Sequence, residues 1–89
     1  MLNHEATLFV ANLPWQMTED DLVRLFGQFA DVVGARVIPD RKTGRSRGYG
    51  LVELATVEQV GAVCATLNGC QLNGRHLEVM PARRKPVRQ

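Results

Sequence analysis

The chain has 89 residues, of which 45% are hydrophobic and 22% are charged, and its formal net charge is +2. This length and composition fit one small folded domain and exclude a second domain or a disordered chain. No apolar run approaches the roughly 20 residues of a membrane span and no secretory signal opens the sequence, so we expect a soluble cytoplasmic protein without membrane contact.

The first predicted element is a strand at residues 8–13, LFVANL. Leu8, Val10 and Leu13 can face a core, and the alternation turns Phe9 to the opposite side. A ring on a face where a solvated strand would carry polar residues indicates a surface that binds something.

A helix is predicted next, because Thr18 and Asp21 have the spacing of a capping box. The acidic residues at 19–21 lie in its first turn, where the helix dipole favours negative charge, so they need no docking partner. Its apolar residues recur at helical spacing and are expected to form a core face: Leu22, Leu25, Phe26 and Phe29.

A second strand is predicted at residues 34–39, where it ends in a proline. Its inward positions are Ala35 and Val37. Its outward positions are Arg36 and Ile38, and a basic loop with a glycine as its turn residue follows.

The third strand, RGYGLVEL at residues 47–54, also alternates. If it neighbours the first strand, Phe9 and Tyr49 share one open surface, and we expect Leu51 to lie between them. One face of the strand would consist of Gly50, Val52 and Leu54, and the other of Tyr49, Leu51 and Glu53, with Arg47 at the edge.

A second helix is predicted to begin at Thr56, which pairs with Gln59 in the manner of a capping box. Asn68-Gly69 predicts its end, and Asn-Gly at residues 73–74 is the strongest hairpin-turn signal in the chain. The apolar stripe of this helix is Val57, Val60, Val63, Cys64 and Leu67.

The last predicted strand spans residues 75–80, with Leu77 and Val79 inward. Its outward residues would share the open face with the two rings: His76, Glu78 and Met80.

The predicted order is strand, helix, strand, strand, helix, strand. It is typical of an α+β protein with the split βαβ (ferredoxin-like) fold, βαββαβ, in which a four-stranded antiparallel sheet carries two helices on one face. The other face is left for function. From Pro81 onward the sequence has no periodicity, so we expect a domain at residues 6–82 and a flexible basic tail at residues 83–89.

Eight of the eleven basic residues lie in two segments. Either segment alone is best explained as a solvated face, whereas two of them flanking one aromatic sheet favour a surface that follows phosphates. One segment contains Arg41, Lys42, Arg45 and Arg47, and the other, in the tail, contains Arg83, Arg84, Lys85 and Arg88.

The strands LFVANL and RGYGLVEL resemble the hexapeptide and octapeptide ribonucleoprotein motifs of the RNA-recognition motif family. The chain also resembles the small single-domain RNA-binding proteins of bacteria, although an excised domain would look the same. Further segments resemble the family in order and spacing across residues 6–82: NLPW, TEDDLVRLF, DRKTGRSRGYG, LNG and NGRHLEV.

The resemblance implies that the partner is single-stranded RNA, with single-stranded DNA bound more weakly. It implies that Phe9 stacks under a base, that Tyr49 stacks or packs against a base or ribose, and that Arg47 pairs with a phosphate. The predicted RNA-binding residues also include Asn12, Arg36, Ile38, Leu51, His76, Glu78, Met80, Arg45, Arg83 and Arg84.

Two positions depart from the family pattern. Leu51 stands where the family commonly has a third ring, so we expect lower affinity, since a stacked base contributes about 1 to 3 kcal/mol. Glu78 stands where relatives often carry a basic residue, and with Glu53 it places two carboxylates near the anionic path. These carboxylates either weaken binding or accept hydrogen bonds from base edges.

A protein-binding or self-associating module is a second hypothesis, because the outward apolar residues can form one patch: Phe9, Ile38, Tyr49, Leu51 and Met80. An enzyme is not expected, because the sequence brings together no nucleophile, base and orienting group, although acylphosphatases share this strand order. The spacing of Cys64 and Cys70 and the isolation of His4 and His76 indicate no metal site, and we predict a monomer without a cofactor.

Overall fold

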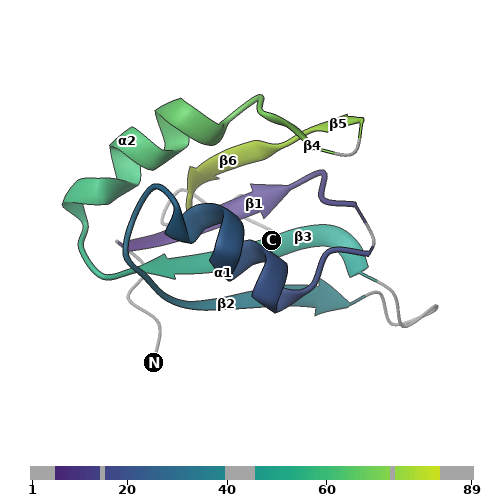
Figure 1. Ribbon diagram of the computed structural model, residues 1–89, viewed down its shortest axis with the longest axis horizontal. Coiled ribbons are helices and arrows are strands. Elements are labelled where there is room, and N and C mark those ends of the chain that lie inside the picture. Colours follow the sequence, from purple (N-terminus) through teal and green to yellow (C-terminus); the bar gives the residue numbers. More distant parts are fainter. Residues whose placement is uncertain (1–5, 15, 40–45, 73, 83–89) are drawn as a thin grey trace, which may run out of the picture.

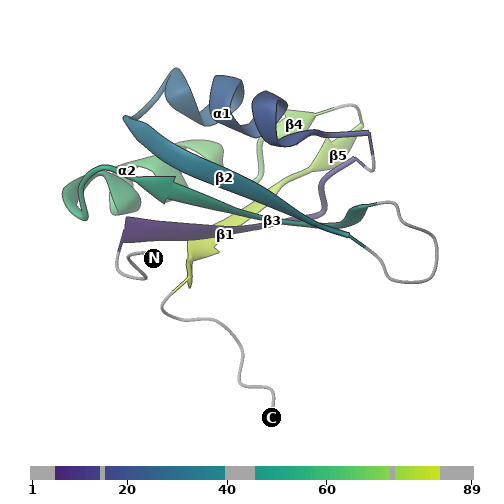
Figure 2. The same ribbon diagram turned by 90° about the horizontal axis from the view of Figure 1, so that it is seen from below.

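The computed structural model describes residues 6–14, 16–39, 46–72 and 74–82. Four strands form one antiparallel sheet in the order β2-β3-β1-β6, and both helices cover the same face of it (Figures 1 and 2). The predicted split βαβ fold is therefore confirmed. The elements are β1 (Thr7–Ala11), α1 (Glu19–Gly27), β2 (Val32–Pro39), β3 (Ser46–Leu54), α2 (Glu58–Leu67), β4 (Gln71–Leu72), β5 (Arg75–His76) and β6 (Glu78–Pro81).

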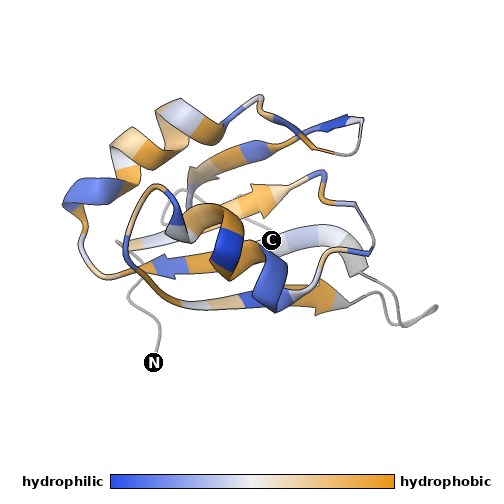
Figure 3. Ribbon diagram, in the orientation of Figure 1, coloured by the Kyte–Doolittle hydropathy of each residue, from blue (hydrophilic) through white to orange (hydrophobic). Residues whose placement is uncertain are grey.

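The hydrophobic core lies between the sheet and the two helices. Hydrophobic and hydrophilic residues are interleaved along α1 (Figure 3), so that one side of this helix packs on the sheet while the other stays in solvent. The core residues are Leu8, Val10, Val52, Leu54 and Val79 from the sheet, Leu22 and Phe26 from α1, and Val60, Val63 and Leu67 from α2, with Leu13 from the loop after β1 and Leu77 from between β5 and β6.

The end of β1 contains a change of phase that strict alternation would not predict. Because Phe9 faces away from the core, alternation alone would also turn Leu13 away from it. Asn12 has a φ of +64°, in the left-handed region, and this turn brings Leu13 back under the sheet, where it is 1% exposed. The Leu13 amide then donates to the Gly48 carbonyl at 2.9 Å, which ties the loop to the start of β3.

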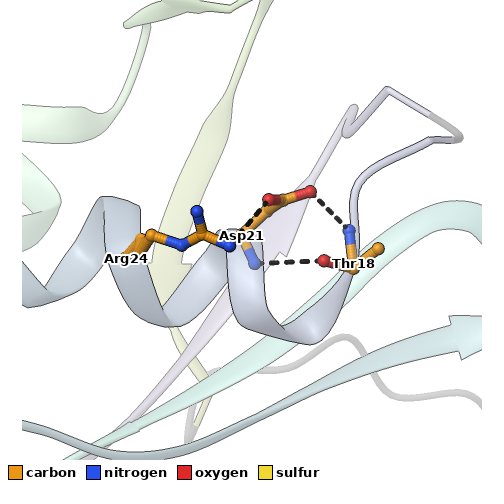
Figure 4. Close-up of polar contacts among 3 residues, drawn as sticks. All are labelled: Thr18, Asp21 and Arg24. Atoms are coloured by element: carbon orange, nitrogen blue, oxygen red, sulfur yellow. Dashed lines mark hydrogen bonds and ion pairs between the residues drawn. The ribbon is translucent and has the colours of Figure 1, made fainter.

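The predicted capping box at the start of α1 is confirmed (Figure 4). The Asp21 amide donates to the Thr18 hydroxyl and the Thr18 amide donates to the Asp21 carboxylate, both at 3.1 Å. The hydrogen bond from the Thr18 backbone, followed by that from its side chain, lowers the pKa of Asp21. Arg24 lies 3.9 Å from the same carboxylate, but both side chains are solvated and such a pair adds little stability.

Phe29 does not belong to the core face of α1, contrary to the prediction. The helix ends at Gly27 and Gln28 is its C-cap, so the helical spacing stops before it reaches Phe29. That ring is 46% exposed. Ala30 packs against the core in its place.

The predicted capping box at the start of α2 is wrong. The N-cap position is Val57, one residue after Thr56, and it makes no side-chain cap hydrogen bond. The Gln59 side chain instead accepts a hydrogen bond from the Asp31 amide at 3.1 Å, which joins the loop after α1 to the first turn of α2. Val57 is consequently 43% exposed rather than part of the apolar stripe.

The last predicted strand is divided in two. The hairpin turn is confirmed, with Gly74 at a φ of +82°, although Asn73 lies outside the described residues. β4 and β5 form a separate two-stranded sheet, so His76 does not lie on the main sheet as predicted. The break occurs at Leu77, whose amide and carbonyl bond to the segment after α2 rather than to a strand.

The main sheet extends further than predicted at its C-terminal end. Pro81 belongs to β6 and pairs with Leu8, and Ala82 is buried. The predicted basic loop with Arg45 and the tail with Arg83 and Arg84 lie outside the described residues. Within the described ranges, neither helix has the length and apolar character needed to cross a membrane.

Candidate nucleic-acid interface

Two rows of side chains cross the sheet face that the helices leave open. The strand registers align them in the direction perpendicular to the strands. The Tyr49 row runs from β2 to β6 as Ile38, Tyr49, Ala11 and Glu78, and the Phe9 row runs as Arg36, Leu51, Phe9 and Met80.

The structure thus brings together seven of the predicted site residues. The sequence named them from alternation on four separate segments, and the registers show that they share one face. They are Phe9, Arg36, Ile38, Tyr49, Leu51, Glu78 and Met80.

The rings of Phe9 and Tyr49 contact each other diagonally across β1 and β3. Their centroids lie 5.5 Å apart and their planes are inclined by 35°. Tyr49 is 39% exposed and Phe9 is half-buried, so the pair offers π surface to solvent. The mutual contact restricts both rings before any ligand arrives.

The sequence predicted that Leu51 lies between the two rings, but the structure places it elsewhere. It is directly opposite Phe9 on the neighbouring strand, and Met80 is directly opposite Phe9 on the other side. The Phe9 ring is therefore flanked by two aliphatic side chains. This arrangement makes a continuous apolar platform with one aromatic edge formed by Tyr49.

The charges on this face are unequal at its two edges. Arg36 is exposed on the edge strand β2, and Glu78 is exposed on the opposite edge strand β6. The backbone of Arg47 belongs to β3. A ligand with an anionic backbone is attracted to the β2 side and repelled by the β6 side.

The sequence predicted Asn12 as a binding residue, and the structure also gives it an intramolecular role. Its Nδ2 donates to the His76 carbonyl and its Oδ1 accepts from Arg75 Nη1, both at 2.9 Å. Arg75 was not among the predicted residues. No sequence signal could have identified this contact, because it joins positions 63 residues apart.

Cys64 lies on α2, which covers the face of the sheet opposite to this one. Burial raises the pKa of the Cys64 thiol on α2, which disfavours the nucleophilic thiolate form. Among the residues that the structure describes, no three His, Cys, Asp or Glu side chains gather in a way that would hold a metal ion.

The chain matches known proteins over most of its length. A family model described as "RNA recognition motif" matches residues 8–78. The chain is 42% identical over 82 residues to 29 kDa ribonucleoprotein A, chloroplastic, from Nicotiana sylvestris, covering 92% of this chain and 30% of that protein. It is 43% identical over 79 residues to glycine-rich RNA-binding protein 2, mitochondrial, from Arabidopsis thaliana, covering 89% and 50%. The chain therefore spans half or less of these two relatives.

Solved structures agree in fold. The crystal structure of the RNA-binding protein PG1 superimposes with a TM-score of 0.82 at 38% identity, covering 92% of this chain and 99% of that one. The protein in a structure described as the "Sxl-lethal protein/RNA complex" superimposes with a TM-score of 0.79 at 31% identity, covering 88% and 48%.

Proposed function

Because the chain belongs to the RNA recognition motif family, we propose that it binds a short stretch of single-stranded RNA across its open sheet face. The observation that carries the proposal is the Phe9–Tyr49 ring pair on that face, 5.5 Å between centroids. Every base has a π face, and stacking on an aromatic side chain contributes about 1 to 3 kcal/mol per base.

The proposed roles follow from the two rows. One base stacks on Phe9, with Leu51 and Met80 supplying apolar contact at its edges. Tyr49 stacks or packs against the neighbouring base or its ribose. Because up to two neighbouring unpaired bases are held this way, the site suits single-stranded rather than duplex RNA.

In this proposal the charged residues at the two edges of the sheet orient the RNA. Arg36 on β2 attracts the phosphate backbone, together with Arg47 and the basic residues of the sequence segments 41–45 and 83–88. Glu78 on β6 then lies on the side of the base edges, where a carboxylate accepts a hydrogen bond from a cytosine amine. This gives Glu78 a role in base preference rather than only a repulsive one.

A fluorescence-anisotropy titration with a labelled pool of random single-stranded RNA tests the proposal. The wild-type chain should bind, with an affinity that falls as salt rises. Phe9→Ala should weaken binding, whereas Phe29→Ala should leave it unchanged. Phe29 is a matched control because its ring is 46% exposed and lies in the loop after α1, away from the open face.

A titration in which the chain binds no RNA would support a protein-binding surface instead. If the wild-type chain binds no RNA at any salt concentration, the apolar platform serves a protein partner or a second copy of the chain. A competition with single-stranded DNA in the same titration measures the preference for RNA, which we propose to be the tighter ligand.

We propose a binding module rather than an enzyme, because the relatives in the comparisons are named as RNA-binding proteins and ribonucleoproteins. Three statements stay predictions. They are the division into a domain at residues 6–82 and a basic tail, the monomeric state and the cytoplasmic location. Light scattering checks the monomer, and fractionation of cells carrying the tagged chain checks the location.

A further inference from the structure

The side chain of Asn12 fastens the β4–β5 hairpin to the end of β1. One end of its amide donates to the His76 carbonyl and the other accepts from the Arg75 guanidinium, each at 2.9 Å. Asn12 itself has a φ of +64°, which is uncommon outside glycine. Residues hold such a conformation when the surrounding structure determines it, and such sites are often functional.

The Arg75 guanidinium is not paired with a carboxylate among the residues that the structure describes. Its partner is a neutral amide rather than a carboxylate. Among the residues that the structure describes, no carboxylate lies within 4.0 Å of the Arg75 guanidinium, although Glu78 is only three positions away in the sequence. The residue is exposed, and the guanidinium has five N–H donors, of which Asn12 uses one.

The position of this charge relates it to the open face. Ala11 is the last residue of β1 and occupies the centre of the Tyr49 row, between Tyr49 and Glu78. Asn12 follows Ala11 along the chain, so its hydrogen bond anchors Arg75 just beyond the end of β1, next to the middle of that row. Figure 1 shows the β4–β5 hairpin at the end of the sheet where β1 and β2 finish and β3 begins.

We propose that Arg75 binds a backbone phosphate of the RNA strand whose bases stack on Phe9 and Tyr49, and that Asn12 is its positioning residue. This inference rests on the proposed function and adds a cation that lies outside both ribonucleoprotein strands. A guanidinium matches two phosphate oxygens at once. Because Asn12 already orders the side chain, less rotamer freedom is lost when the phosphate binds.

The experiment compares Arg75→Gln with Arg24→Gln in RNA titrations over a series of salt concentrations. Both variants lose one exposed positive charge, and Arg24 lies on α1, which covers the face of the sheet opposite to that of Phe9 and Tyr49. The hydrogen bond from Asn12 Nδ2 to the His76 carbonyl does not use the Arg75 side chain, so this bond between the hairpin and the end of β1 is available in Arg75→Gln as well. Circular dichroism checks that both variants are folded.

Arg75→Gln should bind RNA roughly tenfold more weakly at low salt, the factor that corresponds to about 1.4 kcal/mol. The slope of log K against log salt should become shallower by about 0.7, the contribution of one phosphate on a single strand. The loss should be the same for different RNA sequences, because phosphates carry no sequence information. Arg24→Gln should leave the slope unchanged.

Asn12→Gly separates positioning from charge. Glycine accepts the positive φ without strain but cannot hold Arg75, so this variant should also flatten the salt slope although every charge is retained. Combining it with Arg75→Gln should add little to the effect of Arg75→Gln alone. If Arg75→Gln and Arg24→Gln give equal affinities and slopes, the proposal for Arg75 is wrong while RNA binding stands; if the wild type binds no RNA, the proposed function itself fails.

Discussion

Gly50 of β3 and Leu22 of α1 meet directly behind the open face. A Cβ atom on Gly50 would lie 3.0 Å from Leu22 Cδ1 and 3.0 Å from the Arg36 carbonyl oxygen. Gly50 separates Tyr49 from Leu51 along the strand, so α1 packs closely beneath the site. The absence of a side chain on the core face here allows the helix to support the strand that carries both outward residues.

Gly50→Ala should therefore destabilise the domain, by the roughly 1 to 3 kcal/mol typical of overpacking, because the backbone oxygen cannot move aside. The matched control is Gly61→Ala on α2, where a Cβ would meet nothing within 4 Å. That variant should be more stable than wild type by about 0.5 to 1 kcal/mol. Urea denaturation measures both changes. Equal effects of the two substitutions would show that the close approach of Leu22 does not matter.

Phe9→Ala and Tyr49→Ala should each weaken RNA binding by about 1 to 3 kcal/mol while the domain stays folded. Because the two rings contact each other, the double variant should lose less than the sum of the single losses. Phe26→Ala should instead cost about 3 to 5 kcal/mol of folding stability, since that ring is fully buried. The measurements are RNA titration and thermal unfolding. Unfolding of Phe9→Ala would contradict the assignment of this ring to the open face.

Leu51→Phe should tighten RNA binding by a fraction of the roughly 1 to 3 kcal/mol that a stacked base contributes. Leu51 is half-buried directly opposite Phe9, so a ring at this position can extend the platform toward β2. Titration of both proteins with one RNA at one salt concentration gives the comparison. Equal or weaker binding by a folded Leu51→Phe variant would argue against stacking here and favour the protein-binding hypothesis.

Thr18→Ala should destabilise the domain by about 1 kcal/mol, because it removes the hydroxyl that accepts the Asp21 amide. Thermal unfolding at neutral pH measures the loss. A variant with unchanged stability would mean that water replaces this hydrogen bond without cost. Asp20→Ala, which changes the same exposed turn without a capping contact, is the control.

Acid should weaken the same capping box. The pKa of Asp21 is lowered in the folded state by the hydrogen bonds from Thr18, so the stabilisation from this carboxylate is complete above its unfolded pKa. It is lost as the pH falls below about 4 and through the folded pKa. The Asp21→Asn variant should show a smaller decrease in stability over that window. Identical acid profiles for the two proteins would contradict the assignment.

Removal of residues 83–89 should weaken binding to all RNA sequences alike. Each phosphate that the basic tail neutralises contributes about −0.7 to the slope of log K against log salt, so the truncated chain should show a shallower slope. A salt series with two unrelated RNA sequences measures both effects. An unchanged slope would place the tail in solvent.

The sequence alone determined the features that depend on near neighbours in the chain. Thr18 and Asp21 are three residues apart, and the capping box needs no other part of the protein. Alternation along β1 and β3 likewise identified Phe9 and Tyr49 as outward residues, because side chains on a strand point to opposite faces in turn. The fold class followed from the order of these local elements.

Only the tertiary structure showed at which residues contacts between distant segments override these local preferences. Gln59 resembles a capping residue but bonds to Asp31, and Pro81 lies beyond the last predicted strand but pairs with Leu8. The left-handed turn at Asn12 and its bonds to Arg75 and His76 likewise appear only when the hairpin reaches the end of β1. In each case the tertiary fold selects the partner, because a polar or backbone group bonds to whichever partner the fold brings within reach. The spacing of residues along the sequence does not tell which distant residues will lie within hydrogen-bonding distance of each other.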